Sequence, residues 1–160
     1  MSSTHKKVVV RKHDRDSIQG HAAPTNFIVE GKLKLLNTSG QVVAISLEDI
    51  KAVYFVREFG ELEPVTRKTF TTRPRTEGLW VRLKFKDNDV SEGLMPNDLT
   101  QNPDEGYLIN PPDPRSNTQR IFVPRSALIS LTVLAVIGAG RRKKTPDIRQ
   151  VSMFDDSLPQ

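Results

Sequence analysis

The feature that most constrains the fold is a strand–turn–strand pattern at residues 79–94, with the sequence LWVRLKFKDNDVSEGL. Apolar and charged residues alternate from Trp80 to Phe85, which predicts a strand with one buried face. The polar residues from Lys86 to Asp89 predict a turn whose aspartates hydrogen-bond the backbone. The residues from Val90 to Met95 predict the returning strand. A chain organised around such a unit is expected to fold as short strands joined by tight turns.

The opening segment repeats this pattern at a displacement of 73 residues. Val8 and Val10 then fall on Val81 and Leu83, Asp14 and Asp16 on Asp87 and Asp89, and Gly20 on Gly93. The ends of the two halves match at a displacement of 78 residues. Val43 and Ile45 then fall on Ile121 and Val123, and Ile50, Val53 and Val56 on Leu128, Leu131 and Leu134. These matches predict an internal duplication. The alternative is that any two strand-rich segments align on their alternating apolar residues.

Each half of the chain is predicted to hold about five short strands. In the first half they are residues 7–11, 18–22, 32–36, 41–46 and 50–55, with a further extended stretch at 27–29; in the second half they are 80–85, 90–95, 107–110, 120–123 and 128–137. A single helical turn is expected before the last strand of each half, at residues 47–49 and 124–127. The 11 prolines disfavour long helices. The sequence therefore predicts an all-β fold.

Composition divides the chain into four segments. Residues 1–60 are predicted to form a first small domain and residues 78–138 a second. Residues 61–77 combine prolines with scattered charge, which is typical of a linker or extended arm. Phe70 in the middle of this linker predicts that part of it is ordered and packs on a neighbouring surface. Residues 139–160 are predicted to form a flexible C-terminal tail.

The order of elements resembles that of the Sm-like family of small β-barrels, to which Hfq also belongs. The stretch VRLKFKDNDVSEGLM resembles the first Sm motif in its strand, acidic turn and strand ending near Gly93, and IFVPRSALISLTVL resembles the second motif in position and apolar pattern. Glycine suits a sharply bent strand because it has no Cβ. The Arg-Gly pair of the second motif is missing, at residues 47–49 and at 124–126, and no amphipathic helix precedes either unit. The resemblance implies two tandem five-stranded Sm-like barrels and leaves the ligand open.

Composition also excludes several kinds of site. The chain has no cysteine, which rules out disulfides, thiolate zinc sites, iron–sulfur clusters and thiol nucleophiles. No nucleophile elbow, Walker loop, dinucleotide fingerprint or His-Glu metalloprotease motif occurs. The three histidines, His5, His13 and His21, match no familiar metal-binding spacing. We therefore predict no catalytic residue, no metal site and no cofactor.

The net charge of +5 is unevenly distributed. Lys and Arg outnumber Asp and Glu by 9 to 6 over residues 1–60, whereas the ratio over residues 78–140 is 6 to 7. A dedicated nucleic-acid-binding protein usually carries a stronger basic face. The first residues lack the apolar run of a secretion signal, and no apolar run is long enough to span a bilayer. We expect a cytoplasmic protein that does not enter the membrane.

Two arginines near the N-terminus form the first candidate ligand site. Arg11 and Arg15 match the Arg-x-x-x-Arg half of the pattern by which PilZ-like proteins hold the phosphates of cyclic di-GMP. Two guanidinium groups suit a phosphodiester. The other half of the pattern is only partly met by residues 37–39, because Val42 stands where a glycine is expected. The alternative is a solvated hairpin turn.

Two arginines of the linker form the second candidate. Arg73 and Arg75 lie close in sequence to Phe70. Phosphate-binding groups beside an aromatic ring suit a single nucleic-acid strand, although one ring is limited support.

These features favour a binding or scaffold module without enzymatic activity. Small barrels expose strand edges that can pair with another chain, so we expect protein–protein contact or self-association into a homo-oligomer. The alternative is an RNA- or nucleotide-binding regulator, Hfq-like or PilZ-like, that acts through Arg11, Arg15, Arg73 and Arg75.

Overall fold

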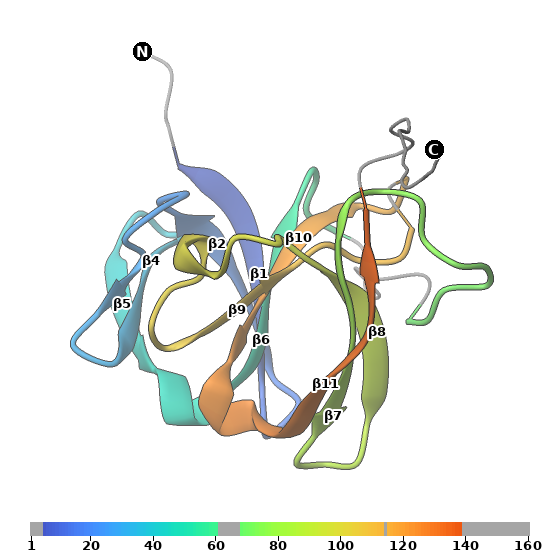
Figure 1. The fold of residues 1–160 in the computed structure, drawn as a ribbon. Helices are drawn as coiled ribbons and strands as arrows, with labels where there is room; N and C mark the ends of the chain where they lie inside the picture. The colour runs from blue at the N-terminus through green and yellow to red at the C-terminus, as the bar shows by residue number, and fades with distance from the viewer. Residues whose placement is uncertain (1–4, 61–67, 114, 139–160) are drawn as a thin grey trace, which may run out of the picture.

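The structure, a computed structural model, describes residues 5–60, 68–113 and 115–138. The first half contains β1 (Lys6–Lys12), β2 (Ser17–Ala22), β3 (Ile28–Val29), β4 (Lys32–Asn37), β5 (Val42–Ser46) and β6 (Ile50–Val56). The second half contains β7 (Gly78–Phe85), β8 (Val90–Met95), β9 (Gly106–Ile109), β10 (Thr118–Pro124) and β11 (Leu128–Ile137). Single 3-10 turns occur at η1 (Leu47–Asp49), η2 (Leu99–Gln101) and η3 (Arg125–Ala127), and these ranges hold no α-helix (Figure 1). The prediction of an all-β fold is confirmed.

The strands form two antiparallel sheets. The larger has the order β3-β4-β2-β1-β6-β10-β9, with β5 paired to β4, and the smaller has the order β11-β7-β8. Neither sheet closes on itself within the described residues, although one bridge between Leu94 and Asn110 joins β8 to the end of β9. β6 of the first half pairs with β10 of the second, so one sheet runs through both halves (Figure 1). A division into separate barrels at 1–60 and 78–138 therefore stays a prediction.

The strand pairings follow the same order in the two halves. β1 pairs with β2 and with β6, β2 with β4, and β4 with β5. In the second half, β7 pairs with β8 and with β11, a bridge links β8 to the residue after β9, and β9 pairs with β10. In each half a 3-10 turn precedes the last strand, as the sequence predicts.

The turns of the two long hairpins have the same backbone hydrogen bonds. In the first, the amide of Lys12 donates to the carbonyl of Asp16 at 2.9 Å; in the second, the amide of Phe85 donates to the carbonyl of Asp89 at 2.9 Å. Arg15 and Asn88 occupy the same place in these turns, with φ of 75° and 70°. The aspartates hydrogen-bond the turn backbone as predicted, because Asp87 Oδ1 accepts from the amide of Asp89 at 3.0 Å.

Two apolar cores lie on opposite sides of β10. The first is built mainly from β1, β4 and β6, and it includes the fully buried Phe122 of β10. The second is built mainly from β7, with one buried residue each from β8, β9 and η3, and it includes the next residue of β10, Val123. Successive side chains of a strand point to opposite faces, so one strand contributes to both cores. β10 thus joins the two halves through packing as well as through hydrogen bonds.

The predicted linker and tail are only partly described. Residues 61–67 and the whole predicted tail, 139–160, lie outside the described residues. The rest of the linker contacts β8: the amide of Glu92 donates to the carbonyl of Lys68 at 2.6 Å. The ring of Phe70 packs edge-on against Trp80, with ring centroids 6.0 Å apart. A search of the described part of the chain found no helix with the length and apolarity needed to cross a membrane.

Candidate functional site

The two predicted arginine pairs lie at opposite ends of β6. Arg11 and Arg15 belong to the β1–β2 hairpin, where Lys12 pairs with Ile50 at the start of β6. Arg73 and Arg75 lie beside Arg57, which follows the last residue of β6. A strand of seven residues spans about 20 Å. The four arginines therefore form two separate places rather than one site.

The hairpin pair lies on an exposed turn. Arg15 is exposed, and Arg11 Nε donates to Ser17 Oγ at 3.2 Å across the hairpin. Asn37, part of the incomplete PilZ-like pattern, instead closes the β4–β5 turn: its Oδ1 accepts from the amides of Ser39 at 3.0 Å and Gln41 at 2.9 Å. This geometry fits the solvated-turn interpretation.

The linker pair lines a cleft of about 540 Å³, which we call the arginine cleft. Its walls are the described arm 70–76, shown in green in Figure 1, the residues around β9 and β10, and the end of β6. The side chains that line it comprise three arginines, Arg57, Arg73 and Arg75, with threonine, amide and apolar groups. Among the described residues, no Asp or Glu lines it. The cleft is therefore a cationic hollow of the size that binds small organic ligands.

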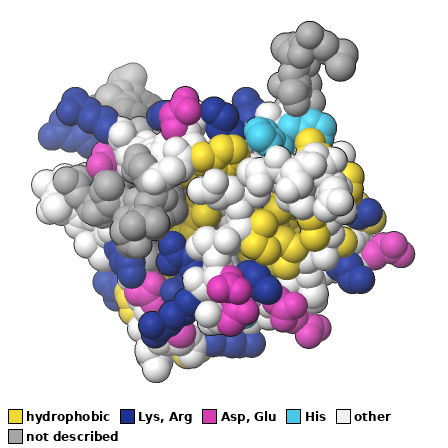
Figure 2. Space-filling model, turned by 180° about the vertical axis from the view of Figure 1, so that it is seen from behind, with side chains coloured by type: hydrophobic (Ala, Val, Ile, Leu, Met, Phe, Trp, Pro, Cys, Tyr) yellow, Lys and Arg dark blue, Asp and Glu magenta, His cyan; other side chains and the backbone are white. Residues whose placement is uncertain are grey.

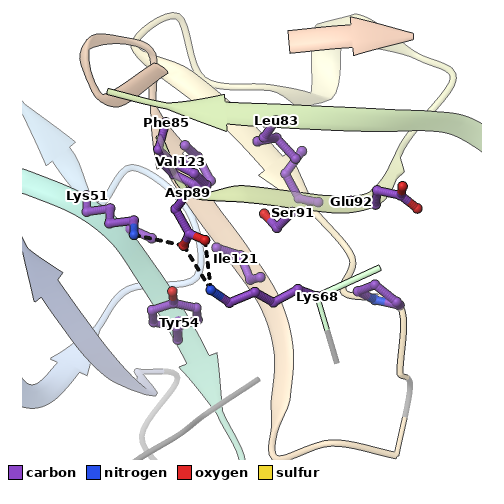
Figure 3. Close-up of a pocket in the computed structure, with 13 residues that line it drawn as sticks. Lys51, Tyr54, Lys68, Leu83, Phe85, Asp89, Ser91, Glu92, Ile121 and Val123 are labelled. Atoms are coloured by element: carbon purple, nitrogen blue, oxygen red, sulfur yellow. Dashed lines mark hydrogen bonds and ion pairs between the residues drawn. The ribbon is translucent and has the colours of Figure 1, made fainter. Parts of the chain in front are cut away.

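Lys51 forms the centre of a charged cluster between the two halves. Its Nζ lies 2.8 Å from Asp87 Oδ2 and 3.0 Å from Asp89 Oδ2. Lys68 Nζ lies 2.8 Å from Asp89 Oδ1, so Asp89 bridges two ammonium groups (Figure 3). Lys51 Nζ also lies 4.9 Å from the centre of the Phe85 ring, within the range of a cation–π contact. Thus β6, the β7–β8 turn and the arm are held together by one ion-pair network.

The network shifts the pKa values of Lys51, Asp87 and Asp89 toward their charged forms. Hydrogen bonding from Lys51 lowers the pKa of Asp87. Burial acts to raise the pKa of Asp89, but the hydrogen bonds from Lys68 and Lys51 outweigh it and the pKa is lowered. Burial likewise acts to lower the pKa of Lys51, but its bonds to Asp87 and Asp89 raise it above its ordinary value. All three groups carry charge at neutral pH.

The hollow beside this network is too small for a ligand. Leu83, Phe85, Ile121 and Val123 line it together with Lys51 and Asp89 (Figure 3), and its volume is about 40 Å³. That volume admits about one water molecule. The network therefore fits a structural connection between the halves better than a binding site. Sequence reasoning missed it because Lys51 and Asp87 are 36 positions apart and match no motif.

In the described part of the chain several strands, β5 and β11 among them, have an edge without a partner strand. In the described part of the chain β5 pairs only with β4, and β11 pairs only with β7. β11 is ten residues long, contains neither a charged residue nor proline, and exposes Ile129, Val133 and Val136 to between 49% and 59%. Val42, at the start of β5, is 72% exposed. Long apolar edges of this kind pair readily with another strand.

Charges of both signs occur on the face that Figure 2 shows, where Lys and Arg side chains are interspersed with Asp and Glu. Hydrophobic side chains gather toward the side where Figure 1 places β4 and β5. Among the described residues no group of three or more His, Cys, Asp and Glu side chains is arranged to hold a metal ion. His21 packs edge-on against Phe59 at 5.5 Å between ring centroids, whereas His13 lies in the hairpin turn.

One comparison places the chain among known proteins. The model of a family of unknown function, DUF6982, matches residues 4–135. The chain belongs to this family. Searches of the curated proteins and of the solved structures found no match to the chain. The family carries no assigned activity, so the function must be argued from the geometry of the cleft and the edges.

Proposed function

We propose that this chain is a non-enzymatic scaffold module that assembles with copies of itself, through the edge of β5 on one copy and the edge of β11 on the next. The observation behind the proposal is that two strands, one from each half of the chain, already pair edge to edge within a single copy. β10 pairs antiparallel with β6 and so joins the two halves edge to edge. A cytoplasmic location and the absence of enzymatic activity stay predictions.

The edge strands β5 and β11 correspond to the two strands of that internal contact. β5 directly precedes η1 and β6 follows it, as β10 directly precedes η3 and β11 follows it. η1 begins at Leu47 and η3 begins 78 positions later, at Arg125. β5 therefore corresponds to β10, and β11 corresponds to β6. Pairing β5 with β11 of another copy repeats the contact that already exists.

The register of the internal contact predicts which residues face each other. Arg120 of β10 lies opposite Phe55 of β6. Moving each residue by the same 78 positions places Val42 opposite Val133. These side chains are 72% and 49% exposed, and pairing places them side by side so that each covers part of the other. Burying apolar surface drives most protein–protein association.

The resemblance to Sm-like proteins fits this proposal. The matching order of pairings in the two halves, and their matching hairpin turns, support an interpretation as two tandem Sm-like units. An interface between two different edges is head-to-tail, so it produces a ring if the rotation closes and a filament if it does not.

The test is the oligomeric state of the full chain, measured by light scattering after size exclusion. The wild type is expected to assemble, and Val42→Lys and Val133→Glu are each expected to reduce assembly, because a charge on an edge opposes pairing. Leu99→Lys is the matched control. Leu99 is 61% exposed in η2, which belongs to neither edge strand, so this variant should assemble as the wild type does.

A rescue experiment tests the register. In the double variant Val42→Lys/Val133→Glu, each interface between copies brings a lysine opposite a glutamate, and opposite charges across strands attract. The double variant should therefore assemble better than either single variant. A wild type that stays monomeric over its whole soluble range contradicts the proposal, as does equal loss of assembly in Leu99→Lys.

A further inference from the structure

We infer that the arginine cleft is a nucleotide-binding site, which takes a phosphate ester carrying a flat ring, either as a single nucleotide or as one unit of a single-stranded nucleic acid. This function is independent of the self-assembly proposed above. The inference is argued from the charge of the cleft, from the hydrogen bonds that hold its walls, and from the separate polar and apolar parts of its lining.

The charge of the cleft selects an anion. Arg73 and Arg75 are exposed and bring two guanidinium groups to the cleft, and Arg57 also lines it. Among the described residues that line the cleft there is no carboxylate. Guanidinium groups recognise phosphate oxygens in a bidentate manner. A phosphate is the common biological anion that best suits such groups.

The arm that carries two of these arginines is held against the smaller sheet. The amide of Phe70 donates to Glu92 Oε1 at 3.1 Å, and the same oxygen accepts from Trp80 Nε1 at 3.2 Å. Further along, Pro74 is buried while Arg73 and Arg75 on either side of it are exposed. Burial of Pro74 holds both arginines on the solvent side of the arm, where they line the cleft.

The opposite wall is fixed by a reciprocal pair of hydrogen bonds. Asn117 Oδ1 accepts from the amide of Glu58 at 2.9 Å, and Asn117 Nδ2 donates to the carbonyl of Glu58 at 2.7 Å. The amide of Arg57 also donates to the carbonyl of Asn117 at 2.9 Å. The backbone that carries Arg57 is therefore attached to the loop between β9 and β10. Positions held in this way reduce the entropy lost on binding.

The cleft also has an apolar part. Phe70, Leu94, Pro111 and Pro112 line it, and the two prolines are buried. Threonine and amide side chains of Thr71, Thr72, Asn110 and Gln119 offer hydrogen bonds. A ligand that uses all three parts has a phosphate, a polar sugar-like region and a flat ring. The volume of about 540 Å³ is adequate for one nucleotide.

The test is a titration of the full chain, at low and at high salt, with a nucleoside monophosphate, with a labelled single-stranded RNA hexamer and with inorganic phosphate. The expected result is saturable binding of the nucleotide or the hexamer that weakens as salt rises. Hexamer binding at least about tenfold tighter than nucleotide binding identifies a strand as the natural ligand, because successive units then add contacts. Comparable affinities identify the single nucleotide. Phosphate binding as tightly as both overturns the assignment of a nucleotide.

The variants locate the site. Arg73→Gln/Arg75→Gln removes two exposed charges and is expected to weaken binding by about tenfold or more. The matched control is Lys32→Gln/Lys34→Gln, which removes two exposed charges of β4. Val133→Lys should bind as the wild type does, which separates this site from the assembly edges. No binding at low salt, or equal weakening by the control pair, overturns the inference.

Discussion

Gly93 shows how one residue sets the path of a strand. It lies opposite Val81 in the β7–β8 pair, and a Cβ added to it would overlap the side chain of Ile109 and lie 2.8 Å from the carbonyl oxygen of Asn110. Gly20 has the same role opposite Val8, where a Cβ would lie 2.6 Å from the carbonyl oxygen of Leu36. The sequence-based expectation of a glycine at a sharp bend thus has a concrete cause, which is the close approach of the next strand.

We predict that Gly93→Ala destabilises the protein by about 1–3 kcal/mol, because the added methyl group meets backbone that cannot move without disturbing the sheet. The free energy of unfolding in urea measures this effect. Gly138→Ala is the control, since nothing lies within 4 Å of a Cβ at that position. Equal stability of the wild type and Gly93→Ala would show that β8 and β9 are not so close.

Asp89 contributes stability through its charge. Asp89→Asn keeps the shape of the side chain but weakens the contacts with Lys51 and Lys68. We expect a loss of about 1 kcal/mol at neutral pH, measured by urea unfolding. Asp16→Asn, at the exposed and equivalent position of the first hairpin, should change stability by less than about 0.5 kcal/mol.

The pH dependence of this contribution has a definite sign. The pKa of Asp89 is lowered in the folded protein, so its contribution is complete above its ordinary value in the unfolded chain, about 4. It is lost as the pH falls through the lowered folded-state pKa. The difference in stability between the wild type and Asp89→Asn should therefore shrink below about pH 4. A difference that stays constant into strong acid would mean that the charge of Asp89 is not the cause.

At the scale of elements, the local pattern of the chain was informative. The alternation at residues 80–85 predicted β7, and the helical turn at 47–49 and the strand at 128–137 agree with η1 and β11 residue for residue. The turn η2 was missed because Leu99 to Gln101 carries no periodic signal, and Asp98 caps it through an exposed side chain. Short alternating strands can be predicted from sequence because each depends on its own residues and on the turns that flank it.

The sequence did not predict which strands of the two halves pair with each other. β10 and β6 both carry apolar residues on each face, and no residue in either marks the other as its neighbour. The cleft depends on this pairing, since Arg57 and Gln119 come to one hollow only when β6 and β10 lie side by side. Sequence reasoning therefore selected Arg73 and Arg75 but grouped them with Arg11 and Arg15, and it omitted Arg57. Contacts between residues far apart in sequence carry no local pattern.

At the scale of the whole molecule, β10 makes the two halves dependent on each other. Phe122 packs against Phe27 of the first half, with ring centroids 5.2 Å apart, while Val123 belongs to the second core. Unfolding the first core would expose Phe122 and remove the β6 partner of β10 together. Cooperative unfolding is the expected behaviour of a domain of this size, and here a shared strand supplies the coupling.

We predict that a substitution that weakens the first core also lowers the stability of the smaller sheet. Leu35 lies in β4, is fully buried in the first core and belongs to no strand paired with β7 or β8. Leu35→Ala should destabilise the protein by about 2–5 kcal/mol. Trp80, the only tryptophan, lies in β7 and reports on the smaller sheet by its fluorescence. Its unfolding transition should move to lower urea by the same amount as the transition seen in far-UV circular dichroism.

The alternative, two halves that unfold independently, gives a different result in the same experiment. The Trp80 transition would then stay at its wild-type position in Leu35→Ala, and circular dichroism would separate into two steps. Leu99→Ala is the control, because Leu99 is largely exposed and its truncation should move neither signal. Coincident shifts would mean that the division at residues 61–77 is a boundary in the sequence pattern and not in the folding unit. The physical cause would be β10, which has one face in each core, so that loss of one core also removes a packing surface from the strand that serves the other.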